Sequence, residues 1–342
     1  MTSTAGGPGG KSFGWINREL IASGQTLKHM NPYGGEDRFW IGPEGGQFSI
    51  FFAKDVPFDF DHWQTPAAID TEPFEVVSKT ADAASFRRTM RLVNYSGTTF
   101  DVQVDREISV LDRDQAIEQL GAPVGPSVKM VAFESSNRMT NAGTEPWTRQ
   151  TGLLSIWILG MFNPSPQTTI VVPFNVGPES RLGPVVNDTY FGKVPASRLV
   201  VRDGVLFFSG DGQYRSKIGL TPKRARNVLG SYDAANQVLT IVQYNKPQGV
   251  LDYVNSMWEL QNEPFRGDTI NSYNDGPATP GAKPMGPFYE LETSSPAAAL
   301  APGQSIVHTH RTFHLVGGKA ELDPIAKALL GVTIAEITSA LP

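Results

Sequence analysis

The sequence contains no cysteine, and this absence excludes a first set of chemistries. Disulfide bonds, thiolate metal sites and a cysteine nucleophile all require the missing side chain. Charged residues are also scarce, at 18% against a usual value of about 25%. The 29 lysine and arginine residues are outnumbered by 34 acidic ones, so the formal net charge is -5. A chain without a basic excess does not attract a polyphosphate, and we therefore predict no nucleic-acid partner.

Long apolar segments are missing as well. No run of about 18 uncharged apolar residues occurs, so no membrane-spanning helix is expected. The segment from Met1 to Lys11 is rich in threonine, serine and glycine, and it lacks the basic and then apolar pattern of a secretion signal. A chain whose leader had been removed would show the same pattern, so the sequence leaves the cellular location open, including the periplasm and the cell exterior.

Glycine and proline are, in contrast, abundant, at 34 and 26 of 342 residues. They follow no period and form no low-complexity tract, which excludes collagen and general disorder and leaves a folded, turn-rich protein. We predict a flexible tail over residues 1–12, one large domain over residues 13–318 and a helical extension over residues 319–342.

Alternation of apolar and polar residues predicts strands along most of the chain. Between Phe100 and Val110 the apolar residues lie at even positions and alternate with polar residues, as in a half-buried strand. Turn-forming residues separate the predicted strands, and this favours antiparallel sheets packed face to face. Residues 271–286 are expected to be a long irregular loop. Further strands are predicted at 47–53, 129–135, 154–159, 168–172, 199–201, 205–209, 238–244, 288–293 and 305–315.

A few short helices are expected beside these strands. The apolar residues between 15 and 22 fit one helix. Asp323 followed by Pro324 is typical of a helix start. Thr333 with Glu336 three residues later is the pattern of a capping box for a second C-terminal helix.

Two carboxylates lie on one predicted strand near the C-terminus. Alternation places Glu290 and Glu292 on the same face of the strand, about 6 to 7 Å apart. Carboxylates at that spacing raise each other's pKa and suit acid and base chemistry in a partly desolvated site. A solvated sheet face would show the same spacing, so this pattern alone leaves both interpretations open.

Three of the five histidines lie on the next predicted strand. His308, His310 and His314 share one face, and imidazole titrates near neutral pH. The face therefore suits proton transfer or, at His308 and His310, a divalent metal. A row of hydrogen-bonded structural histidines is the more common outcome, and no other cofactor is predicted.

A second group of candidates lies in a glycine-rich segment, residues 33–46. Its glycines allow the backbone to turn tightly and to approach a ligand. Arginine provides a forked donor, carboxylates accept hydrogen bonds, and an aromatic plane stacks on the C–H face of a sugar. A place in the core is the alternative for either tryptophan, but the combination predicts a sugar or oligosaccharide partner. The predicted binding residues are Glu36, Arg38, Trp40, Glu44, His62 and Trp63.

The segment from Tyr289 to Leu315 resembles the C-terminal strands of the galactose mutarotase (aldose 1-epimerase) superfamily. The shared pieces are Leu291-Glu292-Thr293, the turn Pro302-Gly303 and the strand from His308 to Phe313. The glycine-rich segment is also similar to the region of that family that contacts the sugar. The resemblance implies an all-β, antiparallel β-supersandwich, here with short C-terminal helices, that binds carbohydrate in a concave sheet groove.

The resemblance also implies catalytic roles. Glu292 would take the proton from the anomeric hydroxyl of a sugar, with assistance from Glu290 and from His310 or His308. The histidine acid that mutarotases carry in a mid-chain strand has no counterpart between residues 141 and 161. Ser155 and Trp157 stand near its expected place.

The missing acid leaves three functions open. The first is a mutarotase-like isomerase, in which His308, His310 or His62 replaces the acid and Arg38 and Trp40 position the ring. The second is a glycoside hydrolase or polysaccharide lyase on the same fold, since two carboxylates can cleave a glycosidic bond. The third is a carbohydrate-binding protein without catalytic activity.

Overall fold

The structure is a computed structural model that describes residues 4–5, 11–279 and 281–342, and it confirms the all-β, antiparallel prediction. Within these residues the strands form a ten-stranded sheet, a five-stranded sheet and a two-stranded ladder. The ladder joins β1 (Thr4–Ala5) to β2 (Lys11–Ser12). Most of the predicted tail over residues 1–12 lies outside the described residues. No helix in the described part of the chain is long and apolar enough to cross a membrane.

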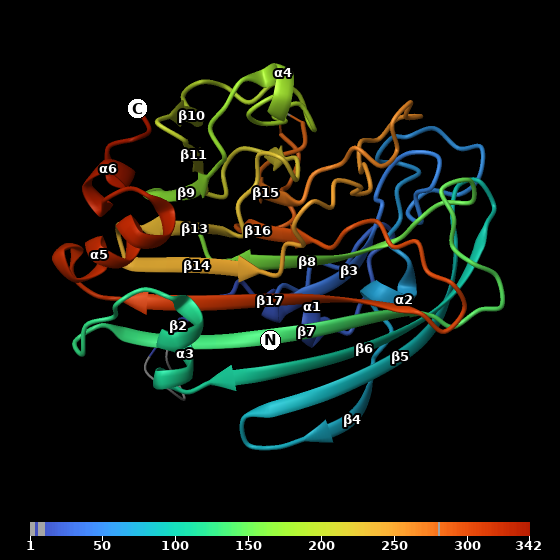
Figure 1. Cartoon of the computed structure of the whole chain (residues 1–342), viewed down its shortest axis with the longest axis horizontal. Helices are drawn as coiled ribbons and strands as arrows, with labels where there is room; N and C mark the ends of the chain where they lie inside the picture. The colour runs from blue at the N-terminus through green and yellow to red at the C-terminus, as the bar shows by residue number, and fades with distance from the viewer. Residues whose placement is uncertain (1–3, 6–10, 280) are drawn as a thin grey trace.

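The ten-stranded sheet is assembled from strands of both halves of the chain. Its last strand in sequence, β17, lies in the middle of the sheet, where it pairs with β14 on one side and β7 on the other (Figure 1). This one strand therefore joins the two halves of the sheet. In spatial order the strands are β10 (Leu199–Arg202), β11 (Val205–Ser209), β9 (Thr168–Pro173), β13 (Val228–Asp233), β14 (Val238–Tyr244), β17 (Ser305–Val316), β7 (Lys129–Asn141), β6 (Thr99–Leu111), β5 (Ala83–Val93) and β4 (Glu75–Lys79).

The five-stranded sheet packs on one face of the larger sheet. Leu291, Ile218 and Ile270 on its inner face contact Val172 and Phe208 of the ten-stranded sheet. These alternating apolar residues remove one face of each strand from water, which is the main stabilising contribution of a sandwich. In spatial order the strands are β12 (Ser216–Leu220), β15 (Ile270–Asn274), β16 (Tyr289–Ser294), β8 (Ser155–Phe162) and β3 (Arg38–Gly42).

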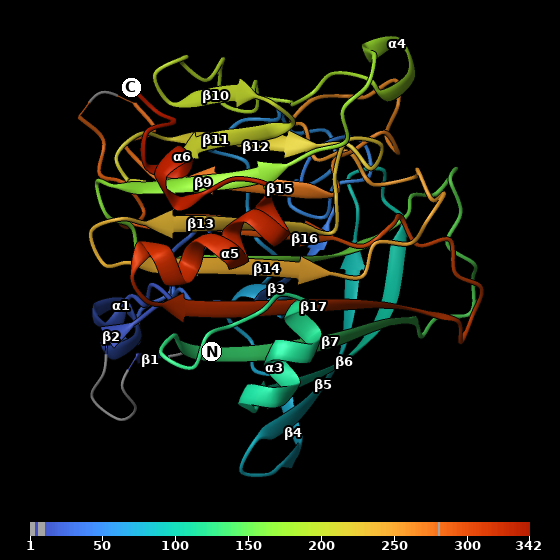
Figure 2. The same cartoon turned by 60° about the vertical axis from the view of Figure 1, so that its left-hand side comes forward.

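Helices cover the opposite face of the ten-stranded sheet. Leu322, Ile325 and Ile334 of the two C-terminal helices pack in one apolar cluster with Val171 and Ile241 of the sheet. Figure 2 shows α5 (Lys319–Leu330) and α6 (Ile334–Thr338) lying over this face, with α3 (Arg113–Leu120) beside them. The half of the sheet under these helices is thus buried on both sides. The other helices are α1 (Arg18–Ser23), α2 (Ala67–Asp70) and α4 (Glu179–Leu182).

Several predicted elements differ from the structure. Residues 47–53 form turns and bends in place of a strand. Residues 271–274 of the predicted loop belong to β15 (Ile270–Asn274), and the predicted helix at 15–22 begins at Arg18. Helix α5 begins before Asp323, and Pro324 lies inside it. The carboxylate of Asp323 instead accepts a hydrogen bond from the backbone N–H of Ile334, at the start of α6. The predicted capping box at the start of α6 is confirmed.

The histidines of β17 point into the space between the two sheets. His308 Nε2 and His310 Nδ1 lie 2.8 and 2.9 Å from the hydroxyl oxygen of Thr293 on β16. Burial, together with the neighbouring imidazole of His310, lowers the pKa of His308 to about 3, and burial lowers that of His310 to about 4. Both rings are therefore neutral in the folded protein at physiological pH.

Acidification should destabilise the fold through these two rings. Below about pH 6.5 the unfolded chain binds protons on His308 and His310 that the folded chain does not bind, so stability falls as pH falls. Each histidine should cost up to about 3 kcal/mol between pH 7 and pH 4. Urea unfolding at several pH values should show a reduced loss in H308Q and H310N, which keep a polar atom near Thr293 without a titrating ring.

The exposed histidine at position 62 provides the control for this measurement. Its side chain is 40% exposed, so H62Q should change the pH dependence of the unfolding free energy much less than H308Q or H310N does. An unchanged pH dependence in H308Q and H310N would contradict the argument.

Candidate active site

Alternation along β16 sends two carboxylates to the outer face of the five-stranded sheet. Leu291 and Thr293 point toward the core between the sheets, so Glu290 and Glu292 point the other way. Glu292 lies opposite Asn271 of β15 on one side and Leu159 of β8 on the other. The predicted placement of both glutamates on a common face therefore agrees with the register of the sheet.

The outer face carries a small cavity with aromatic walls. The cavity has a volume of about 60 Å³, which is smaller than the 300 Å³ or more of typical ligand pockets. A ligand the size of a sugar ring therefore requires rearrangement of lining side chains, and Phe60, which is 47% exposed, and the flexible Met30 and Met285 are suited to this. The cavity is lined by Met30, Trp40, Glu44, Phe60, Trp63, Trp157, Leu159, Phe191, Arg215, Lys217, Trp258, Tyr273, Met285 and Glu290.

Glu292 is not among the lining residues, because two neighbours cover it. Its side chain is fully buried, and one carboxylate oxygen, Oε2, accepts hydrogen bonds from Trp157 Nε1 at 2.8 Å and Lys217 Nζ at 3.1 Å. The ammonium group of Lys217 also lies 4.7 Å from the centre of the Trp157 ring. Glu292 is therefore the buried counter-ion of Lys217, and Lys217 stands between it and the cavity.

Lys217 is the cation around which the carboxylates gather. Burial alone would lower the pKa of Lys217, but the carboxylates of Glu292, Glu44 and Glu290 outweigh burial and raise it. The side chain is thus charged at neutral pH, although only 6% of it is exposed. The charged lysine is bonded directly to Glu292, and it acts on Glu44 and Glu290 through its electric field.

Glu290 and Glu44 are the two titratable acids that line the cavity. Burial and the negative charge of Glu292 raise the pKa of Glu290 well above its ordinary value. Burial raises the pKa of Glu44 to about 7, although Lys217 acts in the opposite direction. At neutral pH Glu44 is therefore about half ionised, and Glu290 holds its proton more tightly than an ordinary carboxyl. A pair of this kind suits acid and base chemistry.

Aromatic rings enclose these acids. Trp40 and Trp157 meet edge to face at 5.3 Å between ring centres, and Trp63 stacks on Trp258 at 5.8 Å. Trp40 and Trp63 therefore line the cavity, as predicted for a sugar platform, and each also packs in the apolar cluster beneath it. Arg38 lies beside this wall, over the Trp40 ring, and is held in an ion pair with Asp70 without lining the cavity.

Two predicted binding residues lie elsewhere. Glu36 is fully buried, and its carboxylate bonds to the backbone N–H of Gly14 at 2.9 Å and to His314 Nε2 at 2.7 Å. His62 points to solvent beside Asp59, 2.6 Å from its carboxylate. Neither residue lines the cavity, because Glu36 serves as the buried partner of a β17 histidine and His62 sits in an exposed turn.

The predicted convergence of glutamates and histidines is wrong. His308 and His310 bond to Thr293, which points to the inner side of β16, whereas Glu290 and Glu292 point to its outer side. The sheet itself separates the two groups, so these histidines do not replace the missing acid at the cavity. Within the described residues, no group of three or more histidine, aspartate or glutamate side chains is placed to hold a metal ion.

The glycines of the glycine-rich segment pack against other backbone, whereas Trp40 and Glu44 of the same segment line the cavity. At Gly34, with a φ of 87°, an added Cβ atom would lie 2.1 Å from the carbonyl oxygen of Trp15. At Gly45 it would lie 2.3 Å from the carbonyl oxygen of Met257. These glycines allow segments distant in sequence to touch, and that contact fixes the loop from which Glu44 projects.

Local sequence patterns contain only weak signals for the other residues that line the cavity. Lys217 lies 75 residues from its partner Glu292, and no local pattern connects them. Arg215 and Lys217 are two residues apart in the sequence, just before a short apolar stretch. This spacing places two cations on one side of extended backbone, and it is the one local pattern that points to them. For Trp157, the sequence shows only that it lies near the expected position of the missing histidine acid.

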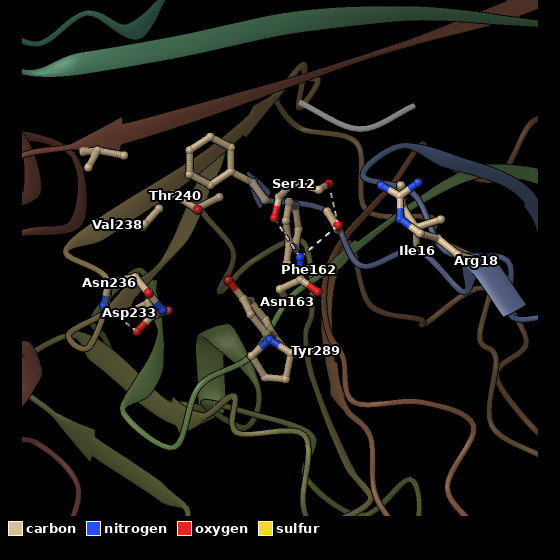
Figure 3. Close-up of a pocket in the computed structure, with 14 residues that line it drawn as sticks. Ser12, Ile16, Arg18, Phe162, Asn163, Asp233, Asn236, Val238, Thr240 and Tyr289 are labelled. Atoms are coloured by element: carbon tan, nitrogen blue, oxygen red, sulfur yellow. Dashed lines mark hydrogen bonds between the residues drawn. The ribbon is translucent and has the colours of Figure 1, made fainter. Parts of the chain in front are cut away.

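A larger pocket, of about 630 Å³, lies where Phe162, Thr240 and Tyr289 meet (Figure 3). Two of its central polar groups already have partners in the protein: Thr240 is 2.9 Å from His314 Nδ1, and the Tyr289 hydroxyl is 2.8 Å from Ser231. Asp233 in its wall is bonded to the side chains of neighbouring residues. Asp233 is the one carboxylate among the described residues that line this pocket, whereas Glu44 and Glu290 both line the cavity, and we therefore place the candidate site on the outer face of the five-stranded sheet.

Comparison with family models gives one match, to the family of unknown function DUF6786, and it covers residues 1–341. The chain belongs to this family. No curated protein matches the sequence. The DUF6786 match includes both sheets and the two C-terminal helices, so the candidate site lies wholly within the family's region.

Solved structures with a similar fold have low sequence identity to this chain. The Slr1438 protein from Synechocystis is 12% identical with a TM-score of 0.52, and the match covers 91% of this chain and 86% of that one. A putative aldose 1-epimerase from Escherichia coli is 15% identical with a TM-score of 0.46, covering 81% and 83%. A galactose mutarotase-like protein from Lactobacillus casei is 10% identical with a TM-score of 0.47, covering 90% of each chain. The Synechocystis match shows a shared fold and nothing about activity.

Removal of the buried cation should destabilise the protein strongly. K217M leaves the carboxylate of Glu292 buried with Trp157 as its one remaining partner, which should lower the free energy of unfolding by about 3 to 5 kcal/mol at pH 7. Combining K217M with E292Q removes the unpaired charge and should recover most of this loss. Urea unfolding measures both effects.

An exposed lysine offers a matched control. Lys193 pairs with Asp188 but is 74% exposed, so K193M should cost no more than about 1 kcal/mol. Equal losses in K217M and K193M would show that the buried pair does not contribute as argued.

Proposed function

We propose that this protein binds a carbohydrate in the aromatic-walled cavity and transfers protons at the anomeric centre of the sugar. The observation that carries the proposal is the pair of carboxyls, Glu290 and Glu44, that line one cavity with raised pKa values. Tryptophan faces suit the C–H surface of a sugar ring, and the carboxyls and Lys217 suit its hydroxyl groups.

Ring opening of an aldose requires one proton to leave the anomeric hydroxyl and one to reach the ring oxygen. In the proposed reaction ionised Glu44 accepts the first proton and protonated Glu290 donates the second, and the roles reverse when the ring closes on the other face. Glu292, which the resemblance implied as the base, is covered by Lys217 and Trp157. We assign it the role of holding Lys217 in place.

Two specific observations support alternatives. The same combination of a protonated and an ionised carboxyl is what glycoside hydrolysis requires, so cleavage of an oligosaccharide remains the second candidate. The ion pair between Glu292 and Lys217 sequesters the expected base, and this favours a binding protein without catalysis as the third candidate.

Replacing either lining acid should abolish most of the activity. In polarimetry of freshly dissolved α-anomers, the wild type should accelerate mutarotation, and E290Q and E44Q should each lower the rate constant by about 10² to 10⁴-fold. E259Q, at an exposed position, removes a carboxylate outside the cavity and should retain the wild-type rate.

Equal rates in the wild type, E290Q and E44Q would overturn the isomerase assignment. New reducing ends from an oligosaccharide panel would identify a hydrolase. Calorimetric binding of sugars without either reaction would identify the binding protein.

The rate should depend on pH through Glu44. Since the pKa of this group is about 7, the ionised base is lost as pH falls, and the rate should drop about tenfold for each pH unit well below 7. The rate constant between pH 5 and pH 8 should show this inflection in the wild type. The residual rate of E44Q should lack it, and an identical inflection in that variant would assign the titration to another group.

A further inference from the structure

One cation in the cavity has no polar partner. Arg215 lines the cavity, and in the described part of the chain its guanidinium takes part in no hydrogen bond or ion pair. Lys217, two residues later, is by contrast bonded to Glu292. Arginine carries five N–H donors and remains charged at every physiological pH, so an unpaired guanidinium at a cavity wall is available to a ligand.

Packing holds this guanidinium in place. Its central carbon lies 3.7 Å from the centre of the Phe191 ring, which is a stacked arrangement. Stacking covers a face of the planar group and leaves its N–H edges available for two parallel hydrogen bonds to a carboxylate or phosphate. The aromatic contact thus orients Arg215 without using its donors.

The carboxylates near Arg215 do not satisfy these donors. Asp275 accepts hydrogen bonds from the Tyr273 hydroxyl at 3.0 Å and from the backbone N–H of Gly286 at 2.8 Å. Glu44 is within electrostatic reach of Arg215 and carries only part of a charge at neutral pH. Glu292 is paired with Lys217. The cavity therefore retains positive charge beside its aromatic walls.

Arg215 also lies at a suitable distance from the carboxyl pair. Arg215 directly precedes β12, which carries Lys217, and both side chains line the cavity. Residues two apart on extended backbone are about 7 Å from each other. Arg215 therefore stands about one sugar ring away from Lys217, which lies among the carboxyls. A sugar whose anomeric centre meets Glu290 and Glu44 would place the substituent on the far side of its ring near Arg215.

We propose that the ligand is an anionic sugar, with a carboxylate or phosphate on the ring carbon substituent far from the anomeric centre, and that Arg215 binds this group. The inference rests on the proposed carbohydrate function and specifies its substrate class. A uronic acid and a sugar 6-phosphate share the required chemistry, and the test separates them.

The test is a calorimetric comparison of three kinds of ligand. Glucuronate and galacturonate represent the carboxylates, glucose 6-phosphate represents the phosphate, and glucose and galactose are the neutral parents. For the wild type we expect at least one anionic sugar to bind about tenfold or more tightly than its neutral parent. R215Q should abolish this preference without weakening the binding of neutral sugars, and R215K should retain part of it.

R226Q provides a charge-matched control, since Arg226 is exposed and is not among the residues that line the cavity. It should leave the preference unchanged, and thermal unfolding should confirm that R215Q is folded. Neutral sugars that bind as tightly as anionic ones, with no effect of R215Q, would overturn this inference and leave the proposed function standing. Absence of binding to every sugar tested would overturn both.

Discussion

The period of two residues along β16 is the constraint on which the site depends. Because Leu291 and Thr293 must face the ten-stranded sheet, Glu290 and Glu292 must face away from it. A shift of the β16 register by one residue would bury both carboxylates between two apolar sheets. The desolvation of the carboxylates would then destabilise the fold by more than any ion pair could offset. The core therefore fixes the orientation of the acids, and the chemistry of the outer face follows from the packing of the inner one.

One buried lysine then divides three carboxyls into different roles. Lys217 can pair directly with only one acid, and that acid is Glu292, which it contacts at 3.1 Å. Glu290 and Glu44 feel the same cation less strongly and each loses water to the surrounding rings, so their pKa values rise. Carboxyl groups of the same chemistry thus acquire different roles, because one is bonded to the lysine and the other two are buried without such a bond.

Local sequence patterns predicted the fold better than the site. The strands at 205–209 and 238–244 agree residue for residue with β11 and β14, because each is a short run of β-branched and aromatic residues bounded by turns. Strand β5 was not predicted, because charged residues interrupt its alternation. The strand predicted at 47–53 is wrong, because the buried Phe51 and Phe52 lie in turns and bends yet give the apolar pattern of a strand. Alternation along one strand predicts that Glu290 and Glu292 share a face. Whether His308 lies on the same side of the sheet as these glutamates depends on how the strands are ordered in the two sheets, and no local sequence pattern contains that order.

The central position of β17 has a consequence for how the chain reaches this structure. In the ten-stranded sheet, β17 separates two groups of strands. One group is β10, β11, β9, β13 and β14, and the other is β7, β6, β5 and β4. Only β17 connects the two groups, and it follows both of them in the sequence. During synthesis the two groups of strands can each pair locally, but both keep an open edge until the final strand emerges from the ribosome. Closure of the large sheet is thus a long-range event, because it waits for a strand that follows both groups along the chain.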